Sequence, residues 1–130
     1  MEIFVQLVQE DIVSHQKTVL ADGKANYLDR VLTYTEKDNP NVKHEISFFN
    51  DYVILKRYAD IKSETYLRLN KRGVAKITSE YGTMKFDTYL QDYKCEEDRI
   101  TIRYCIYQGN EVVTSQILVW ILKGLKIWVK

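Results

Sequence analysis

An arginine on an apolar strand face is the residue of this sequence that points most directly to binding chemistry. In "DYVILKR", the two-residue period of a β-strand places Arg57 on the same side as Val53 and Leu55. A guanidinium on an inward face must be paired, and it can hold a carboxylate-bearing ligand through two hydrogen bonds. The alternative is an arginine at the mouth of the fold that reaches water or is bridged to an acidic neighbour.

Two tyrosines also fall on apolar strand faces. Tyr34 shares a face with Leu32, and Tyr104 shares one with Ile102. Their hydroxyl groups are candidates for orienting a small ligand in a pocket. The alternative is that both are core residues whose hydroxyl groups bond backbone carbonyls.

Residues typical of metal or catalytic sites lack the required spacing. His15 and His44 have no cysteine, histidine or carboxylate nearby at metal-ligand spacing, and the acidic run 96–98 fits the tip of a hairpin. The sequence has no nucleophile elbow, no P-loop and no GxGxxG run. We therefore expect no catalytic residue, no metal, no cofactor and no enzyme activity.

Composition narrows the class of protein. The 130 residues fit one domain, residues 1–130, and 19 Lys+Arg balance 18 Asp+Glu to a net charge of +1. This balance predicts no bulk attraction to nucleic acid. The first residues, "MEIFVQLVQED", do not resemble a secretory signal, and the expected location is cytoplasmic.

Turn signals at short intervals separate runs of alternating character, which is typical of an all-β sandwich or barrel. The predicted turns are Asp22-Gly23, Leu28 to Arg30, Asp38 to Asn41, Asn50-Asp51, Asn70 to Gly73, Tyr81-Gly82, Glu96 to Asp98 and Gln108 to Asn110. No segment predicts a helix. The pattern indicates nine or ten strands in an antiparallel meander, which removes its edges by closing into a barrel.

The hairpin 83–108 decides the state of the cysteines. Both of its apolar faces carry even-numbered residues, so residues opposite each other should have numbers with an even sum. A loop at 96–98 then places Cys95 opposite Arg99 and Cys105 opposite Tyr89. Since the two sulfurs are not cross-strand partners, we expect two reduced thiols.

Most of the chain, residues 3–121, resembles the YwiB-like family of small uncharacterised bacterial proteins. The matching features are a strand ending in Lys56-Arg57, a turn near Gly73, the step Tyr81-Gly82, a strand carrying Thr88, and an I-x-I-x-Y strand formed by Ile100, Ile102 and Tyr104. That family is similar to the calycins, so the resemblance implies a closed, lipocalin-like, up-and-down antiparallel barrel. It implies no chemistry, because the family has no established function.

The last stretch, "TSQILVWILKGLKIWVK", has two interpretations. A helix would place Lys123, Lys126 and Lys130 on one basic face, whereas a strand would alternate apolar residues with lysines. The content of Ile, Val and Trp, together with Gly124, favours a strand that ends near Leu122, followed by a turn and a last short strand. The apolar run is far too short to cross a bilayer, so we expect no membrane insertion. The tail would close the barrel or pair with a second subunit in a homodimer.

Two functions lead as hypotheses, and a third, a hydrolase or other enzyme, ranks last because it lacks a motif. In the first, the barrel binds a small, partly apolar ligand through Arg57, Tyr34 and Tyr104, in a cavity of at least a few hundred Å³. In the second, side chains fill the barrel, and the protein acts through its surface or by self-association.

Overall fold

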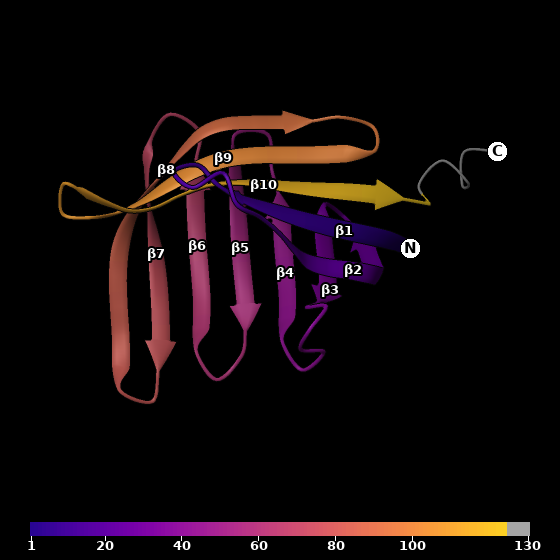
Figure 1. The fold of residues 1–130 in the computed structure, drawn as a ribbon, viewed down its shortest axis with the longest axis horizontal. Coiled ribbons are helices and arrows are strands. Elements are labelled where there is room, and N and C mark those ends of the chain that lie inside the picture. The colour runs from indigo at the N-terminus through magenta and orange to yellow at the C-terminus, as the bar shows by residue number, and fades with distance from the viewer. Residues whose placement is uncertain (125–130) are drawn as a thin grey trace.

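Ten strands make up most of residues 1–124, the part of the chain that the computed structural model describes (Figure 1). They are β1 (Glu2–Asp11), β2 (Lys17–Leu28), β3 (Val31–Thr35), β4 (Lys43–Phe48), β5 (Tyr52–Tyr58), β6 (Lys62–Arg68), β7 (Arg72–Ser79), β8 (Gly82–Cys95), β9 (Arg99–Gln108) and β10 (Glu111–Lys123). Within the described residues, no helix is long and apolar enough to cross a membrane.

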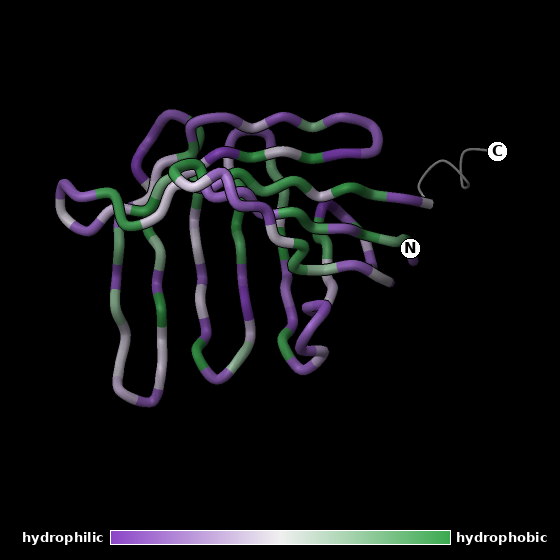
Figure 2. The backbone as a smooth tube through the Cα atoms, in the orientation of Figure 1, coloured by the Kyte–Doolittle hydropathy of each residue, from purple (hydrophilic) through white to green (hydrophobic). Residues whose placement is uncertain are grey.

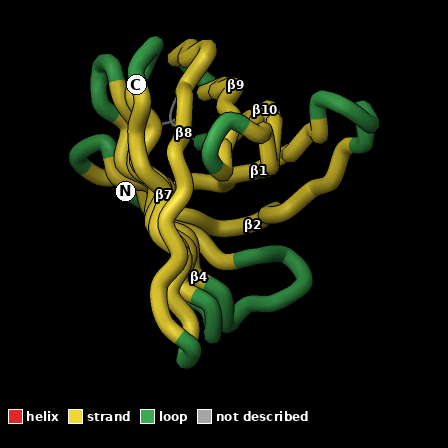
Figure 3. Tube along the Cα trace, turned by 90° about the vertical axis from the view of Figure 1, so that its left-hand side faces the viewer, coloured by secondary structure: helices red, strands yellow, loops and turns green. Residues whose placement is uncertain are grey.

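The strands form a closed antiparallel barrel. Each strand pairs with the next along the chain, and β1 pairs with β10 from Phe4 opposite Lys123 to Asp11 opposite Gln116. Figure 1 shows these two strands side by side, and in Figure 3 β9, β10, β1 and β2 lie to one side of the edge-on strands β4 and β7. Closure pairs both outer strands of the meander, so neither is left as a free edge. The expected all-β, up-and-down barrel is confirmed.

Hydrophobic and hydrophilic residues alternate along much of the strands (Figure 2), and the hydrophobic ones build the interior. Because opposed residues share a face, the inward side chains of neighbouring strands form rows around the barrel. Three consecutive rows across β3 to β7 are Phe48–Val53–Leu67, Leu32–Ile46–Leu55–Thr65–Ala75 and Tyr34–His44–Arg57–Ser63–Ile77. The first two rows are largely apolar and the third is largely polar, so polar chemistry gathers at one level of the barrel. Trp120, fully buried on β10, packs its ring edge-on against Phe48.

All the predicted turns but one lie at or beside strand ends. Asp29 and Arg30 form a two-residue loop with positive φ angles of 52° and 68°, the geometry of a hairpin turn that follows the twist of its strands. The prediction at Asp22-Gly23 was wrong, because Gly23 lies inside β2 and pairs with Val5.

The first turn instead spans residues 12–16. Its cause is Asp11, whose carboxylate accepts hydrogen bonds from the backbone amides of Val13 and Ser14, both at 2.9 Å. Asp22 and Gly23 do not form the expected turn, because they and the residues before and after them pair with β1.

The two cysteines are free thiols, as expected. Cys105 lies opposite Tyr89, but Cys95 lies opposite Ile100 and not Arg99. The register shifts by one residue between Leu90 and Asp92, so the even-sum rule holds only for the part of the hairpin nearer the β9–β10 turn. The alternation of apolar residues along the sequence does not reveal a bulge of this kind.

Gly73 and Thr88 join three strands where the β6–β7 ladder ends. That ladder stops at Thr65 opposite Ala75, and the Thr88 hydroxyl on β8 donates to the backbone carbonyl of Tyr66 on β6 at 2.6 Å. A Cβ atom on Gly73 would lie 2.2 Å from that carbonyl oxygen and 2.6 Å from Thr88 Oγ1. The absence of a side chain at Gly73 therefore allows β8 to bond β6 across β7.

The chain leaves the barrel near the predicted point. Leu122 pairs with Val5, β10 ends at Lys123, and Gly124 has a φ of 105°, which favours glycine. Residues 116–123 close the barrel against β1, so closure does not require the tail beyond them. The predicted last strand, with its helical alternative, lies in 125–130, outside the described residues.

Candidate ligand-binding pocket

A partly enclosed pocket of about 340 Å³ opens at the polar level of the barrel. Its apolar lining consists of Leu7, Leu20, Ile46, Leu55, Leu118 and Trp120. Its polar lining consists of Gln9, Tyr34, Glu36, His44, Lys56, Arg57, Ser63, Thr65 and Tyr104. The volume falls at the low end of the range typical of ligand sites, so the pocket suits a small molecule.

Strand register places the central polar residues next to one another. Tyr34 on β3 lies opposite His44 on β4, His44 lies opposite Arg57 on β5, and Arg57 lies opposite Ser63 on β6. Side chains directly opposite each other on one face are within contact distance. The row follows from the pairing of four consecutive strands.

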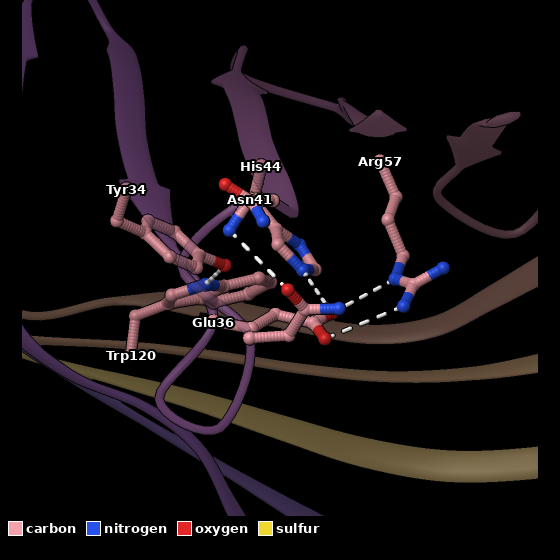
Figure 4. Close-up of polar contacts among 7 residues, drawn as sticks. Tyr34, Glu36, Asn41, His44, Arg57 and Trp120 are labelled. Carbon is pink, nitrogen blue, oxygen red and sulfur yellow. Dashed lines mark hydrogen bonds and ion pairs between the residues drawn. The ribbon is translucent and has the colours of Figure 1, made fainter. Parts of the chain in front are cut away.

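Glu36 brings a carboxylate to this row from the loop between β3 and β4. Its Oε2 atom lies 2.6 Å from His44 Nε2 and accepts from Arg57 Nε at 2.8 Å, while its Oε1 accepts from Arg57 Nη2 at 3.3 Å (Figure 4). The Glu36 amide donates to the Val42 carbonyl, which fixes the backbone of the loop. The carboxylate is thus held by two partners from different strands.

Burial and pairing set the charges of this cluster. The hydrogen bond from Arg57 is the main cause that holds the pKa of Glu36 below its usual value, and Glu36 raises the pKa of Arg57 in return. Burial lowers the pKa of His44, and the hydrogen bond with Glu36 opposes this change only in part. At neutral pH, we assign an ionised carboxylate, a charged guanidinium and a neutral histidine whose Nε2–H donates to Glu36.

Tyr34 connects the polar cluster to the packed core. Its ring stacks on that of His44, with 5.1 Å between centroids, and its hydroxyl accepts a hydrogen bond from Trp120 Nε1 at 2.8 Å (Figure 4). Burial raises the pKa of Tyr34 well above its usual value, so the phenol stays protonated and keeps a hydrogen to donate.

Tyr104 lies on the other wall of the pocket. It pairs with Leu90 on β8 and Gln116 on β10, and its hydroxyl donates to Gln116 Oε1 at 2.8 Å. Burial raises the pKa of Tyr104. The hydroxyl thus bonds a side chain, and not the backbone carbonyl considered from the sequence.

The three residues predicted from the sequence, Arg57, Tyr34 and Tyr104, all line this one pocket. Arg57 is also bridged to an acidic neighbour, as the alternative interpretation required, with 40% of its side chain exposed. Two residues of the cluster, Glu36 and His44, were missed. The sequence did contain a signal for Glu36: the two-residue alternation that places Leu32 and Tyr34 inward also places residue 36 inward.

No group of three or more potential metal ligands occurs within residues 1–124. The Glu36 carboxylate already binds an arginine and a histidine, and this pairing explains its position without a metal ion. The lining offers a ligand hydrogen bonds, charged groups and apolar contacts.

These features define the class: a small closed β-barrel with a mixed polar and apolar pocket at one level of its interior. The chain matches the family model described as "Domain of unknown function (DUF1934)" over residues 6–119, and it belongs to that family. It is similar to the crystal structure of the YwiB protein from Bacillus subtilis, with a TM-score of 0.64 and 19% sequence identity over 95% of this chain and 89% of that one. At this identity the likeness shows a shared fold. The comparison with curated proteins found no match.

Proposed function

We propose that the protein binds a small, partly apolar molecule inside its barrel. The observation that carries this proposal is the pocket of about 340 Å³, whose lining combines apolar side chains with a fixed polar cluster. Sites for small molecules typically combine an apolar lining with a few placed polar groups. The calycin-like architecture implied by the sequence resemblance agrees with such a role.

Each predicted contact has a distinct part in this proposal. Arg57 and Tyr34 offer hydrogen-bond donors to the polar end of the ligand, while the Tyr104 hydroxyl, whose hydrogen is donated to Gln116, can accept one from the ligand. Leu55 and Leu118 would pack against the apolar part of the ligand.

We propose binding and not catalysis as the role of the cluster. A carboxylate whose pKa is lowered by a guanidinium is a weak general base, since proton transfer is efficient when the pKa is near the working pH. We also propose a cytoplasmic location, because the free thiols Cys95 and Cys105 suit a reducing compartment.

Surface charges support a role without nucleic acid. Some cationic side chains of the surface pair with neighbouring carboxylates, as in Lys62–Glu64 at 3.6 Å and Arg72–Asp87 at 2.9 Å. Paired charges weaken the field that a phosphate backbone would meet. The alternative of a filled, self-associating barrel is supported by the apolar rows of the interior, such as Phe48–Val53–Leu67.

The test is native mass spectrometry of the protein purified from its host under gentle conditions. We expect a small-molecule adduct at one copy per chain, and its loss in Leu55→Trp, which fills the pocket. Ile54→Trp is the matched control, because Ile54 is the next residue of β5 and belongs to the outward set, outside the pocket lining. A wild-type protein that carries no adduct and binds no small molecule offered to it would overturn the proposal.

A further inference from the structure

Acceptors and donors in the pocket are used unequally. Among the described residues of the lining, Glu36 alone has an ionised acceptor, and its carboxylate takes hydrogen bonds from His44 Nε2, Arg57 Nε and Arg57 Nη2. Its oxygens are therefore engaged within the protein. A ligand that needed a carboxylate partner, such as an amine, would have to break this cluster.

Donors remain in excess. Arg57 gives Glu36 two of its N–H groups and keeps the others. The Tyr34 hydroxyl accepts from Trp120, but its own hydrogen is donated to no atom of residues 1–124. The hydroxyl groups of Ser63 and Thr65 also line the pocket, and each carries a hydrogen that it can donate. Ser63 lies directly opposite Arg57, and Thr65 belongs to the adjacent row.

We propose that the pocket takes a carboxylate on a small apolar body, with Arg57, Ser63 and Tyr34 as the donors to its oxygens. The inference rests on the proposed function and adds the class of ligand. A carboxylate has acceptors and no hydrogens, so it complements a lining that has spare donors. A guanidinium binds this planar group with charge-assisted hydrogen bonds, and the leucines at positions 20, 55 and 118 receive the apolar body.

The ligand's charge must be balanced, because Glu36 already neutralises Arg57. The titratable and charged groups around His44 are Tyr34 on β3, Glu36 in the following loop and Arg57 on β5, with Tyr104 across the cavity. Lys56, also in the lining, is paired with Glu45 at 3.9 Å. A second carboxylate beside this cluster favours the protonated form of His44. Binding should therefore take up a proton, and affinity should rise as the pH falls from about 8 to about 6, where a carboxylate probe stays ionised.

The experiment compares three probes that differ only in the head group: hexanoate, hexanamide and hexylamine. Isothermal titration at pH 7 should show hexanoate binding roughly tenfold or more tightly than either of the others, as a charge-assisted contact allows. Arg57→Gln should remove that preference. Arg72→Gln is the control, because Arg72 is also paired with a carboxylate but lies outside the pocket.

Repeating the titration from pH 8 to pH 6 tests the proton uptake. We expect the affinity for hexanoate to rise several-fold in the wild type and to stay nearly flat in His44→Gln, while the affinity for hexanamide stays flat in both. Circular dichroism and melting temperature would show whether each variant is folded. If Arg57→Gln fails to fold, Ser63→Ala serves in its place, with a smaller but selective loss for hexanoate.

The outcomes separate the two proposals. Equal binding of hexanamide or hexylamine, abolished by Leu55→Trp, would overturn the carboxylate class and leave the pocket as a binding site. Binding of hexanoate that Leu55→Trp does not change would place the probe elsewhere and overturn both. Selective binding of hexanoate that needs both Arg57 and an open pocket supports both.

Discussion

Tyr34 is the residue on which the core and the pocket both depend. Its hydroxyl is the acceptor for the buried Trp120 N–H, and its ring supports the imidazole of His44 from one face. Because Trp120 is fully buried, its N–H depends on the Tyr34 hydroxyl for a hydrogen-bond partner. One hydroxyl group therefore contributes to stability and to the shape of the ligand site.

We predict that Tyr34→Phe lowers the free energy of unfolding by about 1–3 kcal/mol, the usual cost of leaving a buried donor without an acceptor. Urea unfolding followed by fluorescence measures this change. Tyr81→Phe is the control, since Tyr81 is 92% exposed and should show almost no effect. Equal stability of the two variants would mean that the Trp120 N–H has another partner.

The lowered pKa values of His44 and Glu36 determine how the free energy of unfolding should depend on pH. The folded-state pKa of His44 is lowered by burial, so the unfolded chain binds this proton more readily, and stability falls as the pH drops below the unfolded value of 6.5. The folded-state pKa of Glu36 is also lowered, by Arg57, so its contribution is present above 4.5 and is lost as the pH falls through the folded value.

The expected result is a decline in two stages, with His44 acting first as the pH falls from 7.5. Urea unfolding at a series of pH values measures it, and His44→Gln should remove the first stage while keeping the second. Stability that stays constant from pH 7.5 to pH 5 in the wild type would contradict a buried neutral histidine.

At the scale of the element, the β6–β7–β8 segment depends on a position without a side chain. The Thr88 hydroxyl reaches the Tyr66 carbonyl only because Gly73 leaves the path open. Both Gly73 and Thr88 are among the features that suggested the family from the sequence, and the structure gives them a shared physical reason. A strand glycine of this kind marks the close approach of two backbones.

We predict that Gly73→Ala destabilises the barrel by roughly 2–4 kcal/mol, because the new methyl group overlaps a backbone carbonyl and displaces the Thr88 bond. Gly23→Ala is the matched control. A Cβ atom at Gly23 meets nothing within 4 Å, so that variant should be neutral or slightly more stable. Thermal unfolding of both variants measures the contrast, and similar melting temperatures would contradict the steric argument.

For the whole molecule, alternation and turn chemistry were enough to predict the architecture. The two-residue alternation placed Leu32, Tyr34 and Arg57 on inward faces. With antiparallel pairing of consecutive strands, it also implies that Tyr34 and Arg57 lie in the same row of side chains. Local patterns could not reveal the bulge after Leu90, which moved Cys95 by one partner. The site was harder to predict, because Glu36 lies in a loop and a loop glutamate is usually a surface residue. Only the folded structure shows that His44 and Arg57 lie within 3 Å of its carboxylate.

The closing ladder between β1 and β10 has a consequence for the route by which the chain folds. The other ladders join strands that follow each other along the chain, whereas this one joins Phe4 to Lys123. Contacts between distant residues carry the largest loop-closure entropy, and they tend to form after local ones have reduced the remaining loop. We therefore expect the barrel to be open in the transition state for folding, with its hairpins formed in part.

Stopped-flow kinetics of two core variants would show this order. Leu122→Ala, at the closing ladder, should speed unfolding and leave the folding rate nearly unchanged, while Leu67→Ala in the β5–β6 hairpin should slow folding. If Leu122→Ala instead slows folding and Leu67→Ala speeds unfolding, the closing ladder is already formed in the transition state for folding. If closure comes last, a newly made chain has one stage in which β1 and β10 each present one unpaired edge, and during that stage it is most exposed to joining another copy of itself.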